Sequence, residues 1–147
     1  PGSCRIGERN QFFEGTRIDA TGGGRLVIGD ANTFGPYAVS LLSNRPGAVT
    51  TVGNGVRLVG RIDVVGSCTL GDGCQILGDI SAMNVTLSPG DSYDKPDPDL
   101  RAAVLKGRGR ASHIVLARGK VSNGDGDFHS FPVENQSVYH PRASLIE

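Results

Sequence analysis

Histidine is the side chain that most often serves as a general base or a metal ligand near neutral pH. It occurs three times, at His113, His129 and His140. These residues are 16 and 11 positions apart, and neither spacing matches a short metal-ligand motif. We therefore interpret them as surface or tail residues, and we predict no catalytic residue, no bound metal and no cofactor. The alternative is that the tail delivers them to a site shared with a neighbouring subunit.

Cys68 and Cys74 form a second candidate pair, because two thiolates can hold a metal or form a redox couple. They are six residues apart, in a region where apolar residues also recur every six positions. We expect two small buried residues on different sides of the interior, and a metal or redox pair is the alternative. With Cys4 the cysteines number three, which suits a reducing compartment better than a disulfide framework.

A run of basic residues without an acid lies between Leu100 and Val121. The candidate partner-binding residues in it are Arg101, Lys106, Arg108, Arg110, Arg118 and Lys120. The simplest interpretation is that these residues form a solvated face. The more specific interpretation is a docking patch for an acidic partner protein. Nucleic acid is not expected as a partner, because no aromatic side chains interleave with these charges to stack on bases.

The strands and turns that position these residues can be predicted from a repeat of apolar residues with a period of six. Apolar residues recur at every sixth position from residue 52, namely Val52, Leu58, Val64, Leu70, Ile76 and Ala82. A second series of small, β-branched or sulfur-bearing residues lies four positions later in each repeat, from Val56 to Ile80. Neither the helical period of 3.6 nor the strand period of 2 explains this pattern alone.

A hexad of this kind indicates one short strand followed by one turn. Three hexads would close a triangular coil of 18 residues, in which Leu58 stacks on Ile76 and Ile62 stacks on Ile80. We predict that these four side chains are buried and that the strands of successive coils pair in parallel. Residues Leu70–Leu87 and those near Ile6 are the expected strand edges at the ends of the stack, and we expect the tail or another chain to cover them.

The coil starts share an aliphatic residue, then glycine, then an acid or asparagine. They are Ile6-Gly-Glu, Ile28-Gly-Asp, Val52-Gly-Asn and Leu70-Gly-Asp. Glycine, aspartate and asparagine tolerate the left-handed backbone that tight corners need. The predicted fold class is therefore all-β: a left-handed parallel β-helix of about four triangular coils, with a loop insertion and an irregular C-terminal tail.

The period ends after Leu87. We predict a β-helix over residues 1–121 with a loop insertion at 88–110, and a C-terminal tail over 122–147. The segment Leu100–Leu105 could form one or two helical turns, and His113–Ala117 is the best later strand candidate.

The composition agrees with a thin core surrounded by many tight turns, since the chain has 22 glycines and only 5% aromatic residues. Its 15 basic and 15 acidic residues balance, so no overall field favours nucleic acid or an acidic membrane. It has no run of 18 apolar residues, and membrane insertion is not expected.

The hexads resemble the trimeric acyltransferase-like superfamily, which includes sugar and lipid acyltransferases, gamma-class carbonic anhydrases and the two pointed-end β-helix subunits of dynactin. The segments Ile6–Glu14 and Ile28–Phe34 are most similar to the family of the smaller dynactin subunit. In that family an Ile-Gly-x-x-Asn-x-Phe-Glu coil is followed by an Ile-Gly-Asp-x-Asn coil. His113–Arg118 resembles the late strand of the same family.

The enzymes of this superfamily need histidines in their coils, as a general base or as metal ligands. No histidine lies between Ile6 and Leu87, so the resemblance implies a non-catalytic assembly or adaptor subunit. It would lie in the cytoplasm and cytoskeleton, at the dynactin pointed end, beside a second β-helix subunit and the end of an actin-like filament. There it would support dynein cargo binding on microtubules. The alternatives are a hexapeptide-repeat acyltransferase or gamma-carbonic-anhydrase-like homotrimer, and a self-assembling β-helical scaffold.

Overall fold

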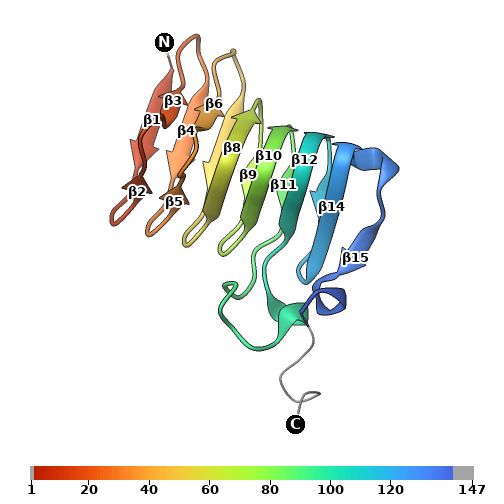
Figure 1. Cartoon of the computed structure of the whole chain (residues 1–147). Helices are drawn as coiled ribbons and strands as arrows, with labels where there is room; N and C mark the ends of the chain where they lie inside the picture. Colours follow the sequence, from red (N-terminus) through yellow and green to blue (C-terminus); the bar gives the residue numbers. More distant parts are fainter. Residues whose placement is uncertain (1, 141–147) are drawn as a thin grey trace.

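The structure is a computed structural model that describes residues 2–140. These residues form two β-sheets and three short 3₁₀ turns, with no α-helix among them. Successive passes of the chain line up side by side, from the N-terminal strands to β14 (Figure 1). The first sheet is wholly parallel and consists of β1 (Ser3–Ile6), β4 (Arg25–Ile28), β7 (Val49–Val52), β9 (Thr69–Leu70), β11 (Thr86–Leu87) and β13 (Val115–Leu116).

The second sheet is parallel except for its last strand. Its main path contains β2 (Gln11–Phe12), β5 (Thr33–Phe34), β8 (Arg57–Val65), β10 (Gln75–Met83), β12 (Val104–Ser112), β14 (Lys120–Asp127) and the antiparallel β15 (Val133–Asn135). Two further strands, β3 (Arg17–Asp19) and β6 (Val39–Leu42), pair beside this path. The 3₁₀ turns are η1 (Pro98–Leu100), η2 (Phe128–Ser130) and η3 (Gln136–Val138).

Each complete coil in the middle of the stack contains three strand segments, as the hexads predict. Strand β8 pairs with β5 through Leu58 and with β6 through Ile62, so one long strand covers two short ones of the preceding coil. The chain bends between the two halves at Gly60, whose φ of +127° is a conformation that glycine adopts readily. Gly78 and Gly107 occupy the same place in β10 and β12.

The register confirms the predicted stacking of the apolar series. Leu58 lies opposite Ile76 and Ile62 lies opposite Ile80, while Val52 lies opposite Leu70. The four side chains predicted to be buried are at most 1% exposed. Because the inner faces of all three segments supply such residues, the core is a narrow aliphatic column inside the coils.

The stack is longer than the four coils expected from the sequence, since the first sheet alone contains six strands. Strand β12 begins at Val104, within the segment expected to be a loop up to residue 110, and pairs with β10 along nine residues. The helical turns expected at Leu100–Leu105 are wrong, because only the short η1 precedes this strand. The repeat was hidden because Ile76 pairs with Leu105, 29 positions later, whereas Leu58 pairs with Ile76 after only 18.

The tail expected to be irregular from Ser122 is also partly ordered in strands. Strand β14 continues to Asp127 and β15 returns antiparallel to it. Its pattern is not apolar, because Ser122 and Gly124 take inner positions. A Cβ at Gly124 would lie 2.9–3.0 Å from ring atoms of Phe128, so this buried ring packs directly on the glycine. Phe128 thereby covers the C-terminal end of the core.

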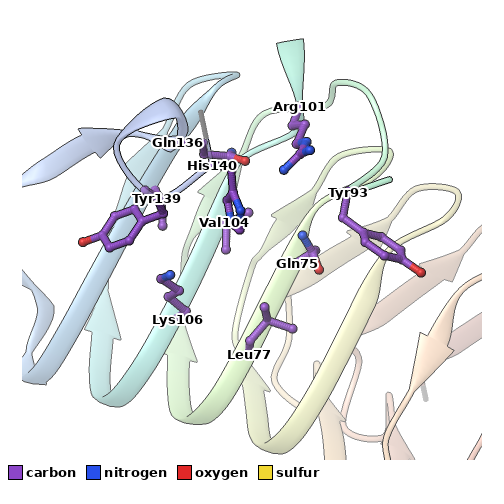
Figure 2. A pocket seen from close by; sticks show the side chains of 10 residues that line it. Gln75, Leu77, Tyr93, Arg101, Val104, Lys106, Gln136, Tyr139 and His140 are labelled. Atoms are coloured by element: carbon purple, nitrogen blue, oxygen red, sulfur yellow. The ribbon is translucent and has the colours of Figure 1, made fainter. Parts of the chain in front are cut away.

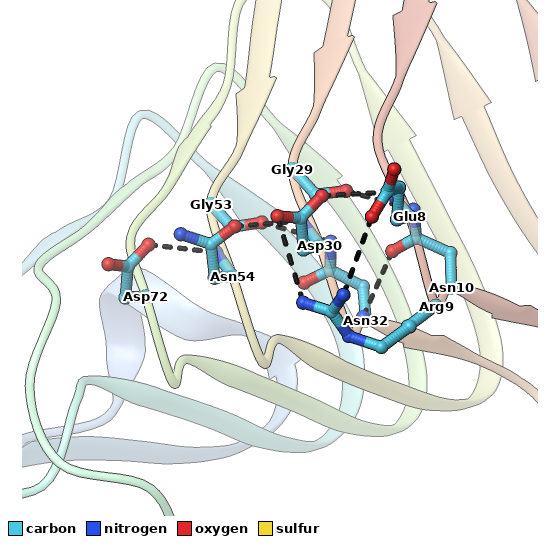
Figure 3. Close-up of polar contacts among 9 residues, drawn as sticks. All are labelled: Glu8, Arg9, Asn10, Gly29, Asp30, Asn32, Gly53, Asn54 and Asp72. Atoms are coloured by element: carbon cyan, nitrogen blue, oxygen red, sulfur yellow. Dashed lines mark hydrogen bonds and ion pairs between the residues drawn. The ribbon is translucent and has the colours of Figure 1, made fainter.

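The glycine-acid corners form a column of side chain-to-backbone hydrogen bonds (Figure 3). The Asp30 carboxylate accepts from the backbone N–H of Glu8 at 2.8 Å, and the Asn54 side chain accepts from the N–H of Asp30 at 2.7 Å. Asp72 accepts in the same way from Asn54 at 2.8 Å. Each aspartate or asparagine side chain therefore accepts a hydrogen bond from a backbone N–H at the corner of the preceding coil. This explains why this residue type recurs after the glycine.

A second column runs through Asn10 and Asn32. The buried Asn32 side chain accepts from the N–H of Val56 at 2.8 Å and donates to the carbonyl of Gly53 at 2.9 Å. We expect Asn32→Ala to lower the free energy of unfolding by about 1–3 kcal/mol, because the buried N–H of Val56 and the partly buried carbonyl of Gly53 would lose their partner. Urea unfolding followed by circular dichroism measures this. The matched change at the exposed Asn123 should alter it by less than about 0.5 kcal/mol, and equal losses would contradict the column's role.

Candidate functional site

The six basic residues singled out in the sequence are distributed over several surfaces. Arg108 lies in a column of alternating charge, with Asp79 beside it on β10 and Asp125 beside it on β14. Its Nε is 3.3 Å from a carboxylate oxygen of Asp125, and Arg61 is 3.9 Å from Asp79 in the same column. The run contains no acid in sequence, but acids from neighbouring coils flank Arg108 in space. Its charge is therefore already offset within the chain.

Arg110 borders an open groove instead. In register it faces Asp127 on β14, and the groove is also lined by His113 and His129. The third histidine, His140, lines a different pocket. The three histidines therefore do not converge on one site.

Lys120 and Arg118 lie near the C-terminal end. The ammonium group of Lys120 donates to the side-chain carbonyl of Asn135, which links β14 to β15. Arg118 is exposed just before β14. Binding of a partner by these residues stays a prediction. Arg108, Arg110, Arg118 and Lys120 do not line the place where Arg101 and Lys106 meet.

That place is a pocket of about 390 Å³ between β10, β12 and the C-terminal segment (Figure 2). Arg101, which follows η1, and Lys106 on β12 both line it, together with His140. Gln75 and Gln136 contribute the remaining polar side chains. No carboxylate is among the described residues that line this pocket.

The apolar part of the lining comes from Leu77, Val104 and Val121, with Tyr93 and Tyr139. Figure 2 shows the two tyrosines on opposite sides, with the strand residues between them. The ring of Tyr139 lies under Lys106, whose Nζ is 3.9 Å from the ring centroid. Such a contact holds the ammonium group over the ring face.

The polar side chains of the pocket are held in place by the surrounding backbone. Arg101 donates to the carbonyl of Lys95 through Nε at 3.0 Å and Nη2 at 2.6 Å. The buried Gln136 donates to the carbonyls of Ala102 at 2.7 Å and Lys120 at 3.0 Å. Gln136 therefore fixes the C-terminal segment to the coils, and Arg101 fixes the preceding loop.

The charged side chains that line the pocket are all positive. The pKa of His140 is lowered from its ordinary value, first by burial and then by the positive charges of Arg101 and Lys106. Near neutral pH the imidazole is therefore mainly uncharged beside two permanent cations. An arrangement of this kind can bind an anion, and it offers no nucleophile beside a general base.

The cysteines lie where the sequence predicted. Cys68 and Cys74 are buried, and their thiols contact the backbone carbonyls of Val65 at 3.4 Å and Ser88 at 3.2 Å. Burial raises the pKa of Cys68 and raises that of Cys74 to about 12. Neither thiol ionises near neutral pH, so both behave as small core residues. Within residues 2–140 no cluster of three metal-binding side chains is found.

The N-terminal end of the stack has a different character. Among the described residues, β1, β2 and β3 pair with a following strand on one side only. Ile6 is 44% exposed and Phe12 is 41% exposed, although Phe12 stacks on Phe34 with ring centroids 5.0 Å apart. Among the described residues the edge expected near Ile6 is uncovered. The edge expected at Leu70–Leu87 is covered by β13, which lies within the later strand candidate His113–Ala117.

A comparison with protein-family models and a search of curated proteins both find no match for this chain. No helix in the part of the chain that the structure describes is long and apolar enough to cross a membrane. What the chain does must therefore be inferred from its own surfaces.

Most residues of the pocket carry no signal in the sequence. Tyr93 lies in the long loop, while Gln136, Tyr139 and His140 follow β15, in a region without a period. Of the lining residues, Arg101 and Lys106 were candidates because they belong to the basic run, and His140 was considered only as a general base or metal ligand. The absence of acids from that run was the one feature that could have pointed to a positive pocket.

Proposed function

We propose that this chain is a non-catalytic assembly or adaptor subunit whose coils wind as a left-handed parallel β-helix and stack on another subunit. Support for the winding comes from the three-segment coils, the 18-residue register between Leu58 and Ile76, and the glycine corners with positive φ. The resemblance of the Ile-Gly-Asp corners to hexapeptide-repeat proteins supports the left-handed sense. An experimentally phased crystal structure tests it, and a right-handed coil would contradict it.

The observation that carries the functional proposal is the outer edge of β1, which has no paired strand within residues 2–140. The outer edge of β1 offers parallel-strand N–H and C=O groups, and such an edge adds a further strand readily. Half-exposed Ile6 and Phe12 extend the aliphatic column to this surface. Within residues 2–140, Phe128 and β15 cover the opposite end, so the two ends of the described stack differ.

Glu8 adds a specific feature to this end. It takes the position that Asp30, Asn54 and Asp72 hold in later coils, where each side chain accepts from the corner N–H of the coil before it. No preceding corner is present within residues 2–140, and the Glu8 side chain is exposed. A docking coil that presents a corner N–H to this carboxylate would continue the column by one step.

The resemblance to the family of the smaller β-helix subunit of dynactin suggests which partner this is. The partner would be a second β-helix subunit at the pointed end of an actin-like filament, in the cytoplasm and cytoskeleton. The complex would support dynein cargo binding on microtubules. Arg118 is an exposed cation available for contacts with such subunits, and the groove beside Arg110 combines a basic residue with the acid Asp127. Arg108 is already paired with Asp125.

Ile6→Lys tests the proposal, because a charge at an apolar strand edge opposes pairing with another chain. We expect affinity-tagged protein to copurify a hexad-repeat chain and an actin-related protein. The lysine variant should recover these partners at least about tenfold less well. The matched control is Val49→Lys, since Val49 is also 44% exposed in the same sheet but on the inner strand β7.

The copurification result distinguishes the assembly subunit from the enzyme and scaffold alternatives. Equal recovery by both variants, or equal loss, would exclude the N-terminal edge as the interface. A homotrimer without other chains would contradict the proposal and favour the acyltransferase or carbonic-anhydrase alternative. Long homopolymers would favour a self-assembling scaffold.

A further inference from the structure

The pocket beside β12 concentrates positive charge without an opposing acid in its lining. Arg101 and Lys106 carry permanent charges, and His140 can take up a third. Two acids nearby lie outside the lining: Glu134 accepts from the Tyr139 hydroxyl at 2.7 Å, and Asp94, on the preceding loop, accepts from Ser92 and interacts electrostatically with Arg101 from outside the pocket. Two fixed positive charges that the lining does not neutralise favour a ligand with about two negative charges.

The donors of this site are restrained before any ligand arrives. Arg101 is anchored to the carbonyl of Lys95 through Nε and Nη2, which leaves N–H groups of its guanidinium for another acceptor. The ammonium group of Lys106 is held over the Tyr139 ring, and within residues 2–140 it forms no ion pair with a carboxylate. Restrained donors lose little conformational entropy on binding, so they favour a tight contact.

The rest of the lining suits a compact apolar body. Leu77, Val104 and Val121 supply apolar lining, and Figure 2 shows the two tyrosine rings at opposite ends of the pocket. The volume of about 390 Å³ falls within the range of small-molecule sites. Tyr93 is itself fixed, because the guanidinium of Arg57 lies 4.0 Å from its ring centroid.

We propose that this pocket binds a small organic phosphate, with the phosphate between Arg101 and Lys106 and a planar apolar group against Leu77, Val104 and the tyrosine rings. A phosphate monoester carries a charge of about −1.5 to −2 near neutral pH, which matches the two cations. Arginine matches the planar geometry of phosphate oxygens with two donors, and lysine supplies a point charge. The ligand is independent of the partner that docks at the N-terminal end.

Binding should be linked to protonation of His140. Its pKa is lowered by burial and by Arg101 and Lys106, and a bound anion offsets both cations. The pKa of the bound state is then higher than that of the free state, so binding takes up a proton and tightens as the pH falls. Phenyl sulfate is the probe for this measurement, because its own charge does not change in the pH range in which histidine titrates.

The test is isothermal titration calorimetry of the full chain with phenyl phosphate. We expect saturable binding to one site, with a dissociation constant of about 1 mM or lower. Lys106→Gln should weaken it by about tenfold or more, since a charge-assisted hydrogen bond is lost, and Lys106→Arg should retain it. Arg118→Gln removes one positive charge outside the pocket and should leave binding unchanged.

Three results would overturn the inference. One is the absence of binding, and another is an equal loss in Lys106→Gln and Arg118→Gln, which would indicate only attraction to overall charge. The third is that inorganic phosphate binds as tightly as phenyl phosphate, which would show that the apolar group of the ligand contributes nothing to binding. With phenyl sulfate, His140→Gln should abolish the pH dependence while circular dichroism remains unchanged, and an unchanged dependence would remove His140 from the site.

Discussion

Gly78→Ala is expected to lower the free energy of unfolding by more than about 3 kcal/mol, one of the two largest losses that we expect for a single substitution. Gly78 has a φ of +122°, which strains any residue with a Cβ. A Cβ at this position would also lie 2.0 Å from the carbonyl oxygen of Gly107 in the next coil. Because this oxygen belongs to the paired strand β12, it can move away only if the coils separate. Urea unfolding followed by circular dichroism measures the loss.

Gly126→Ala is the matched control. Its φ of +106° carries a similar backbone strain, but no atom lies within 4 Å of the position that its Cβ would take. We expect a loss of about 1–3 kcal/mol from strain alone. If the two substitutions cost the same, the close approach of glycines between coils contributes nothing to stability.

Ile62→Asp is expected to unfold the chain or to lower its thermal midpoint severely. Ile62 is 1% exposed and lies between Val39 and Ile80 in the register. The change loses about 1.5–3 kcal/mol of apolar burial and places an unpaired carboxylate in the core, which costs more. Domains of this size are stable by about 5–15 kcal/mol, so the loss is a large share of the total.

Thermal unfolding by circular dichroism gives the result. Ile62→Val is the control that keeps the shape and polarity of the site, with an expected loss of about 0.5–1.5 kcal/mol. An unchanged midpoint in Ile62→Asp would mean that this residue does not face the interior and that the coil register is wrong.

The sequence alone determined the parallel strands, their register and the core in the middle of the chain. These features depend on a repeat that is uninterrupted from Val52 to Ala82. In such a repeat each coil contacts only its neighbours, so the spacing in sequence becomes the spacing in space. The corner residues Asp30, Asn54 and Asp72 were recognisable for the same reason, although their hydrogen bonds to the preceding coil were not.

The tertiary structure decided what lies beyond the repeat. An insertion separates Ile76 from its partner Leu105, and polar residues such as Ser122 take inner positions in β14, so the last coils carry no visible period. The charge of Arg108 is offset by Asp125, which is distant in sequence but adjacent in the stack.

The pocket depends even more on long-range packing. It joins Gln75 on β10, Tyr93 in the loop, Lys106 on β12 and His140 after η3. Only the first and third of these belong to paired strands of the stack, where a register relates them. The loop and the C-terminal segment are also held by side-chain hydrogen bonds, such as those from Gln136 to the carbonyls of Ala102 and Lys120. Such contacts leave no periodic trace in a sequence, because they depend on where two irregular segments meet after the coils have formed.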